Sequence, residues 1–234
     1  MELENISQSI DEKYKDLKHT LGWRFINSSK NTIQNNSGIC MVTLNPSGDI
    51  FEESICALDD SKNAYLDENW ENRGVGKDKL QIQIQYMFNE IHQRTNTYEN
   101  HKELMRNSFM AHFIPFRSPT FDLLHNQKLS VDFSKKLWKQ IFKSPSFNFS
   151  TIICIGREQF EVLEELLMNS YSFNNSKEIK TGWGNYKSVI NEYSNNRKKV
   201  KLVYLQHLSR FSIFNRKENK GKEEIKILFD YIMK

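Results

Sequence analysis

The chain has 234 residues, of which 38% are hydrophobic and 12% aromatic, and its formal net charge is +4. A chain of this length and composition can bury a substantial core, so we expect a single domain over residues 1–234. It contains no run of the roughly 18 apolar residues that a membrane helix needs, and its first residues are acidic rather than signal-like. We therefore expect a cytoplasmic protein with no membrane contact.

The predicted elements alternate between strand and helix along the chain. Apolar runs bounded by turn signals predict four buried strands, at 39–44, 109–114, 151–155 and 200–205. Amphipathic stretches predict an N-terminal helical segment within 1–30, helices at 79–93 and 159–168, and a C-terminal helix within 221–234. The segments 59–76 and 173–196 are polar and loop-like. This alternation predicts an α/β fold, a three-layer α/β/α arrangement around a mainly parallel four-stranded sheet.

The three cysteines indicate neither a disulfide framework nor a metal site. Cys40, Cys56 and Cys154 are odd in number, widely spaced and set in apolar runs. Buried thiols are the simpler interpretation, and no metal or other cofactor is expected.

Basic residues concentrate late in the chain. Between Arg197 and Lys222 there are nine Lys and Arg residues and one acid, Glu218, a local net charge of +8, so the rest of the chain carries −4. Such asymmetry is typical of a surface that binds a polyanion. A solvated loop is the alternative interpretation.

Polar turns follow three of the predicted strands, where an open parallel sheet binds its ligands. The first turn is Leu44-Asn45-Pro46-Ser47-Gly48, in which Asn-Pro ends the strand. The second contains Arg117-Ser118-Pro119, and the third is Gln206-His207-Leu208-Ser209-Arg210-Phe211. The three turns are predicted to meet at one edge of the sheet.

In order and spacing, these turns resemble the motifs of the uracil-DNA glycosylase superfamily. The resemblance implies a uracil-DNA glycosylase-like fold and a role for Asn45 in positioning the water that attacks the sugar. It implies that His207 stabilises the negative charge of the departing base, as an oxyanion hole does. Leu208 stands where the family has proline. Further residues are predicted to contact DNA: Ser47, Arg117, Ser118, Ser209, Arg210, Phe211, Arg216 and Lys217.

The predicted base pocket departs from the family at one position. The resemblance places an asparagine five residues before Arg117, and this chain has His112 there. A neutral imidazole offers one donor and one acceptor, whereas an amide matches uracil with two donors and an acceptor. A modified pyrimidine is therefore an alternative to uracil, and a buried core histidine is the alternative to any base contact. Leu44, Pro46 and Phe51 are predicted to line the pocket, with Tyr65 as the favoured stacking ring.

The leading hypothesis is a monomeric, monofunctional DNA glycosylase acting on double- or single-stranded DNA. No motif places a lysine as a Schiff-base nucleophile, so strand cleavage is not expected. Three cysteines are too few for the four-thiolate iron–sulfur cluster of some superfamily branches. A 5-substituted cytosine in phage DNA would make the enzyme a defence factor. The alternatives are a DNA- or nucleotide-binding module of the same fold without catalysis, and an unrelated α/β enzyme acting on a free nucleotide.

Overall fold

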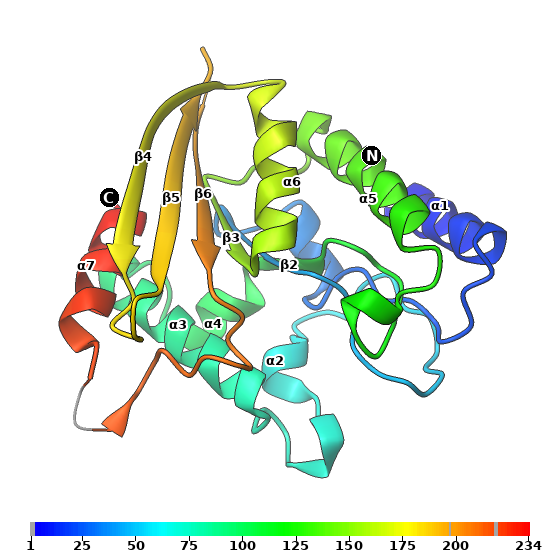
Figure 1. Ribbon diagram of the computed structural model, residues 1–234, viewed down its shortest axis with the longest axis horizontal. Coiled ribbons are helices and arrows are strands. Elements are labelled where there is room, and N and C mark those ends of the chain that lie inside the picture. Colours follow the sequence, from blue (N-terminus) through cyan, green and yellow to red (C-terminus); the bar gives the residue numbers. More distant parts are fainter. Residues whose placement is uncertain (1–2, 197, 218–219) are drawn as a thin grey trace.

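A single mixed sheet of six strands forms the centre of the computed structural model, which describes residues 3–196, 198–217 and 220–234 (Figure 1). The strands are β1 (Ile39–Thr43), β2 (Phe109–His112), β3 (Thr151–Ile155), β4 (Ser172–Lys180), β5 (Lys187–Ser194) and β6 (Lys199–Leu205). Their order in the sheet is β2-β1-β3-β6-β5-β4. The α/β prediction is confirmed, and each of the four predicted strands is present as β1, β2, β3 or β6.

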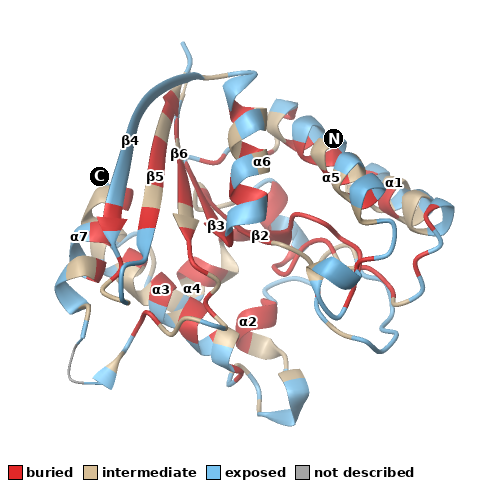
Figure 2. Cartoon of the chain, viewed as in Figure 1, coloured by how far each residue is buried: buried red, intermediate tan, exposed pale blue. Residues whose placement is uncertain are grey.

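The prediction of a four-stranded sheet is wrong, because β4 and β5 extend the sheet beyond β6. The strands β2, β1, β3 and β6 are parallel to one another, whereas β5 is antiparallel to both β6 and β4. The segment 173–196, predicted to be a loop, forms this hairpin. Its edge strand β4 is exposed at every residue except Ile179 (Figure 2), so it lacks the apolar pattern that indicates a strand.

Helices cover both faces of the sheet. They are α1 (Leu3–Asp16), α2 (Ala64–Asp67), α3 (Lys79–Thr95), α4 (His101–Arg106), α5 (Gln127–Lys143), α6 (Arg157–Met168) and α7 (Lys222–Ile232), with 3₁₀ turns η1 (Lys30–Ile33), η2 (Trp70–Asn72) and η3 (Phe121–Leu123). One hydrophobic cluster joins α1, α5 and α6 to one face, and a second joins α2, α3, α4 and α7 to the other (Figure 1). Among the described residues, none of the helices combines the length and the apolar composition that a bilayer span requires.

Local sequence explains where the predicted helices begin and end. Asp78 caps α3 by accepting from Leu80 N, and the Gln81 side chain accepts from Asp78 N in return, which forms a capping box. Asn96 ends the same helix in the left-handed conformation. The helix expected within 1–30 occupies Leu3–Asp16, where Ile6 and Ile10 are fully buried. Of the segment 59–76, predicted to be a loop, two short stretches are helical.

Buried His19 is expected to make the protein less stable in acid. Its ring stacks on Phe116 at 4.3 Å and its Nε2 lies 3.0 Å from Ser130 Oγ. Burial, with a contribution from His125, lowers the pKa of His19 from 6.5 to about 4. Between these two pH values the unfolded chain binds a proton at His19 and the folded protein does not. The free energy of unfolding therefore falls as the pH drops from about 6.5 to about 4.

Urea unfolding between pH 7.5 and 4.5 measures this loss, with an upper limit of about 1.4 kcal/mol per pH unit, reduced by solvent screening. A His19→Gln variant, which has no proton to gain, is expected to show a shallower pH dependence. Equal pH dependence in the two proteins would contradict the assignment.

Candidate active site at the carboxyl edge of the sheet

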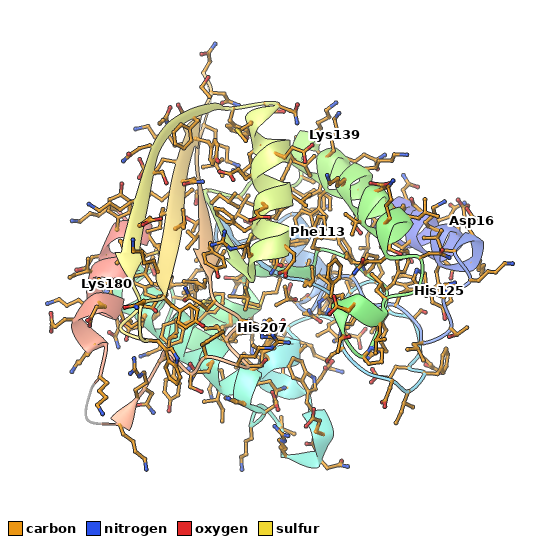
Figure 3. The ribbon with its side chains drawn as sticks, in the orientation of Figure 1. Asp16, Phe113, His125, Lys139, Lys180 and His207 are labelled. Atoms are coloured by element: carbon orange, nitrogen blue, oxygen red, sulfur yellow. The ribbon has the colours of Figure 1, made fainter. Side chains whose placement is uncertain are left out.

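The four parallel strands end level with one another. Thr43 pairs with His112, and Ile155 pairs with Leu205, each pair closing its two strands. Neighbouring strands lie about 4.8 Å apart, so the ends of β1 and β6, on either side of β3, are about 10 Å apart. Figure 3 shows His207 just beyond the end of β6. The turns that carry Asn45 and His207 therefore leave the same edge of the sheet.

Asn45 is held by its amide nitrogen, which leaves its amide oxygen available. Nδ2 donates to Pro46 O at 3.1 Å and to Ser118 Oγ at 2.9 Å. Because a carbonyl oxygen only accepts, these contacts fix the orientation of the amide. No hydrogen bond to Oδ1 occurs within the described part of the chain. Ser118, which in turn donates to Thr120 O at 2.8 Å, joins the turn after β1 to the turn after β2.

Arg117 fastens the loop that follows Asn45. Its guanidinium donates to Ser47 O and to the Glu52 carboxylate, and its side chain is only 8% exposed. Gly48, at φ +129°, leaves room for it, because a Cβ there would lie 2.9 Å from Arg117 Nη1. The Arg117 guanidinium, predicted to contact DNA, is thus engaged by hydrogen bonds within the protein. Ser47, beside it, is exposed.

His207 presents one ring nitrogen and has the other held. Nδ1 lies 2.7 Å from Ser209 Oγ, and Nε2 has no hydrogen-bond partner among the described residues. Burial lowers the pKa of His207, Arg210 lowers it further, and Glu158 opposes the shift. The ring is therefore neutral at pH 7. A Ser209 hydroxyl that donates to Nδ1 leaves the ring proton on Nε2, where it can be donated.

The turn around His207 is anchored by Leu208. The amide nitrogens of Arg210 and Phe211 both donate to His207 O at 3.0 Å. Leu208 is fully buried in the hydrophobic cluster that includes α3 and α7. Burial of this side chain anchors the turn that carries His207.

Both ring nitrogens of His112 are occupied by neighbouring side chains. Asn27 Nδ2 lies 2.9 Å from Nε2, and Thr43 Oγ1 lies 2.8 Å from Nδ1. An amide nitrogen only donates, so Nε2 accepts and the ring proton lies on Nδ1. Burial, together with Arg24 and Arg117, holds the pKa of His112 well below its usual value. The geometry matches the alternative of a buried core histidine, whose two ring nitrogens are satisfied by side chains.

The other predicted pocket residues are not gathered in one place. Tyr65 is 1% exposed and packs edge-on against Trp70 at 5.3 Å, and burial raises its pKa to about 12. Phe51 is 60% exposed, Leu44 is half-buried and Pro46 is buried. In this arrangement Tyr65 is a core side chain, and of these rings only Phe51 stands open to solvent.

The basic segment predicted to bind a polyanion is divided between the two ends of β6. Lys199 lies at the start of β6, while Lys201 Nζ donates to the last carbonyls of α7, Tyr231 O and Ile232 O. Arg210, Arg216 and Lys217 follow the other end of the strand. Two charged residues of the segment, Arg197 and Glu218, lie outside the described residues.

Phe211, predicted to brace the gap left by a flipped base, packs against the turn of the β4–β5 hairpin. Its ring lies 4.7 Å from that of Tyr186 and 6.3 Å from that of Trp183. Arg216 stacks over Trp183 at 4.8 Å and donates to Gly182 O. An aromatic and basic surface therefore continues from the His207 turn.

Sequence reasoning missed a polar cluster beneath the site. Arg24 donates to both carboxylate oxygens of Glu68, which also accepts from Trp70 Nε1 at 2.7 Å. These contacts outweigh burial and lower the pKa of Glu68. No pattern in the sequence indicates this cluster, because Glu68 and Trp70 lie in a stretch with no regular period and Arg24 is 44 residues from Glu68 along the chain.

Two further kinds of chemical group in the described residues are the metal-binding side chains and the three thiols. Within residues 3–196, 198–217 and 220–234, no three or more His, Cys, Asp and Glu side chains are grouped to hold a metal ion. Cys40 and Cys154 are buried, and burial raises the pKa of both thiols. Cys56, half-buried, has its pKa raised to about 12 by the same cause.

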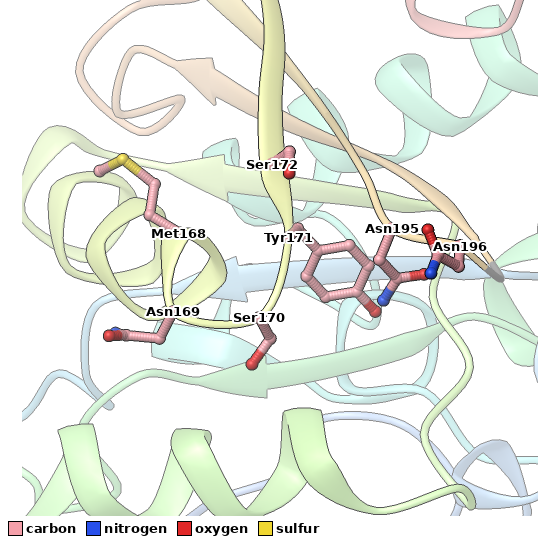
Figure 4. A pocket seen from close by; sticks show the side chains of 7 residues that line it. All are labelled: Met168, Asn169, Ser170, Tyr171, Ser172, Asn195 and Asn196. Carbon is pink, nitrogen blue, oxygen red and sulfur yellow. The ribbon is translucent and has the colours of Figure 1, made fainter.

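A pocket of about 610 Å³ lies at the opposite edge of the sheet, between the end of α6 and the start of β4 (Figure 4). It is lined by Met168, Asn169, Ser170, Tyr171, Ser172, Asn195 and Asn196. These described lining residues include no carboxylate, imidazole or cation, so they do not supply the groups that a hydrolytic site needs.

The fold and the site define an α/β protein whose polar turns gather at the carboxyl edge of four parallel strands. Comparisons of the chain with protein-family models, curated proteins and solved structures found no match.

Proposed function

We propose that this protein is a monofunctional DNA glycosylase, a distant relative in fold of the uracil-DNA glycosylases, that hydrolyses the N-glycosidic bond of a flipped base. One observation carries the proposal: Asn45 and His207 lie at the same edge of the sheet. In each residue a hydrogen bond fixes one nitrogen, Asn45 Nδ2 or His207 Nδ1, and leaves a second polar atom, Asn45 Oδ1 or His207 Nε2, available. Side chains that start about 10 Å apart are suitably spaced to flank a nucleoside. The resemblance of the surrounding turns to the glycosylase motifs supports the same chemistry.

In the proposed reaction, Asn45 Oδ1 accepts a hydrogen bond from a water whose oxygen attacks C1′ of the sugar. The N-glycosidic bond breaks, and the base leaves with the bonding electron pair. His207 Nε2–H donates to the base oxygen on which the negative charge develops. An amide cannot take the water's proton, so this proton passes to solvent and finally to the released base.

The substrate class that we propose is a modified or damaged pyrimidine. The resemblance implies an asparagine that reads uracil at position 112, whereas this chain has a histidine there whose two ring nitrogens are taken by Asn27 and Thr43. Because the amide that would match uracil is not at this position, we propose a 5-substituted cytosine of phage DNA rather than uracil. Action on such DNA in the cytoplasm would make the protein an antiphage defence enzyme.

The proposal is tested by incubating the purified protein with DNA of each kind and counting abasic sites. The panel comprises duplex and single-stranded DNA with uracil, with alkylated bases, with 5-hydroxymethylcytosine and with its glucosylated form. Abasic sites in at least one of these DNAs are expected. DNA binding with a steep salt dependence but no abasic product from any of them would instead support a binding module without catalysis.

The lowered pKa of His207 predicts a flat pH profile for base release. Its pKa lies below 6.5, so the ring is neutral, and able to donate from Nε2, at every pH above that value. The single-turnover rate constant is therefore expected to change little between pH 6.5 and 8.5. A rate that falls as the pH rises through this range would show that the imidazolium is the active form, and would contradict the assigned role.

A further inference from the structure

A basic groove lies between the start of α3 and the segment that follows the His207 turn. Its volume is about 740 Å³, and its lining includes Lys77, Lys79, Tyr86, Trp183, Arg216 and Lys217. Figure 1 shows the chain after β6 crossing α3 at this place. Two hydrogen bonds join the walls, from Gln83 Nε2 to Phe214 O at 3.2 Å and from Phe214 N to Gln83 Oε1 at 3.0 Å.

Three exposed lysines of the groove, Lys77, Lys79 and Lys217, form no ion pair with an acid in the described part of the chain. Arg73, also in the lining, is paired with Glu71 and Asp78 and adds little net charge. The described lining contains no acidic residue. The described lining therefore carries a net positive charge, which attracts an anionic ligand.

Aromatic rings alternate with the cations. Trp183 lies under the Arg216 guanidinium, and Tyr86, whose hydroxyl accepts from Asn215 Nδ2 at 2.6 Å, is partly exposed. Cations that track a phosphate backbone, interleaved with rings on which bases or sugars stack, are the pattern of single-stranded nucleic-acid binding. The volume of the groove lies within the roughly 300–1,000 Å³ of small-ligand pockets, which accommodates a short run of one strand.

The groove and the proposed active site are close to each other along the chain. Ser212, in the lining of the groove, is separated from His207 by the anchored turn that contains Leu208. A strand whose flipped nucleotide lies at His207 would therefore have its neighbouring nucleotides at the groove.

We propose that this groove binds the sugar–phosphate backbone of the DNA strand that flanks the flipped nucleotide, in single-stranded form. This inference rests on the proposed function, which places the flipped nucleotide at His207 and so sets where the flanking strand runs. Its test measures DNA binding and does not depend on catalysis. It assigns a binding role to Lys77 and Lys79 of the α3 side, which no motif in the sequence indicates.

The test compares two triple variants that remove the same charge. The groove variant is Lys77→Gln, Lys79→Gln, Lys217→Gln, and its control is Lys136→Gln, Lys139→Gln, Lys143→Gln on the exposed face of α5. Fluorescence anisotropy measures the affinity of each for a single-stranded 20-mer of ordinary bases between 50 and 300 mM salt. Each lost phosphate contact lowers the salt slope by about 0.7 for single strands.

The groove variant is expected to reduce the slope by about 2 and to lower the affinity at least tenfold, while the control keeps both within twofold of the parent. Equal effects of the two variants would overturn the proposal. So would a groove variant that weakens binding of the annealed duplex as much as that of the single strand. If only the groove variant loses affinity and the protein forms no abasic sites, the groove is a DNA-binding site and the proposed glycosylase activity is wrong.

Discussion

His207→Ala and Asn45→Ala are each expected to slow base release by about 100- to 1,000-fold. His207 supplies the donor aimed at the departing base, and its removal leaves the developing charge without a partner. Asn45 supplies the acceptor that orients the water. Because neither side chain is a core element, thermal melting of both variants is expected to stay near that of the parent, and the loss falls on the single-turnover rate constant rather than on DNA affinity.

Two control variants show whether the loss of rate is specific to the candidate site. His101→Ala, on α4, and Asn169→Ala, at the opposite edge of the sheet, remove the same side-chain types away from the site. Both are expected to retain the parent rate. Ser118→Ala, which removes the hydroxyl that accepts from Asn45 Nδ2, is expected to give an intermediate loss, since it acts by positioning. Near-normal rates in both Asn45→Ala and His207→Ala would refute their assigned roles.

Gly22→Ala is expected to destabilise the protein by about 3 kcal/mol or more, from backbone strain of roughly 1–2 kcal/mol and overpacking of a further 1–3 kcal/mol. Gly22 has φ +84°, and a Cβ added there would lie 1.9 Å from Glu52 O. The chain has to shift at Gly22 or at Glu52. Because Glu52 pairs with Arg117, this shift also loosens the loop that follows Asn45.

Gly184→Ala provides the control for the strain alone. Gly184 also has positive φ, +53°, but nothing lies within 4 Å of an added Cβ. Its expected cost is therefore the strain of roughly 1–2 kcal/mol. Urea unfolding measures both variants, and equal destabilisation by the two would show that the contact between Gly22 and Glu52 is not close.

The sheet was predictable from the sequence where burial is strongest. All residues of β1, β2 and β3 are buried, and such strands appear as continuous apolar runs. The edge strand β4 carries Asn, Ser, Lys and Glu and owes its form to its backbone ladder with β5, which no periodicity reveals. Helix α5 was missed because its buried face includes Ser130 and Ser134 beside Leu137, Trp138 and Ile141, and small polar residues weaken a helical pattern.

The candidate site was predictable only in its turns. Asn45 and His207 follow strands directly, so the parallel sheet brings them to one edge whatever the loops do. The partners of His112 could not be predicted, since Asn27 comes from an irregular segment 85 residues away along the chain. The groove was hidden for a similar reason, because Lys77 and Lys79 meet Lys217 only through the packing of α3 against the segment after β6.

The most direct test of the central claim is the stoichiometry of base release. A DNA of the panel is incubated with the protein, the free base is quantified by mass spectrometry, and abasic sites are counted with an aldehyde-reactive probe. One free base is expected for each abasic site, the DNA strands are expected to break only after alkaline treatment, and neither product is expected with His207→Ala. Absence of free base from every DNA that the protein binds would contradict the proposed function.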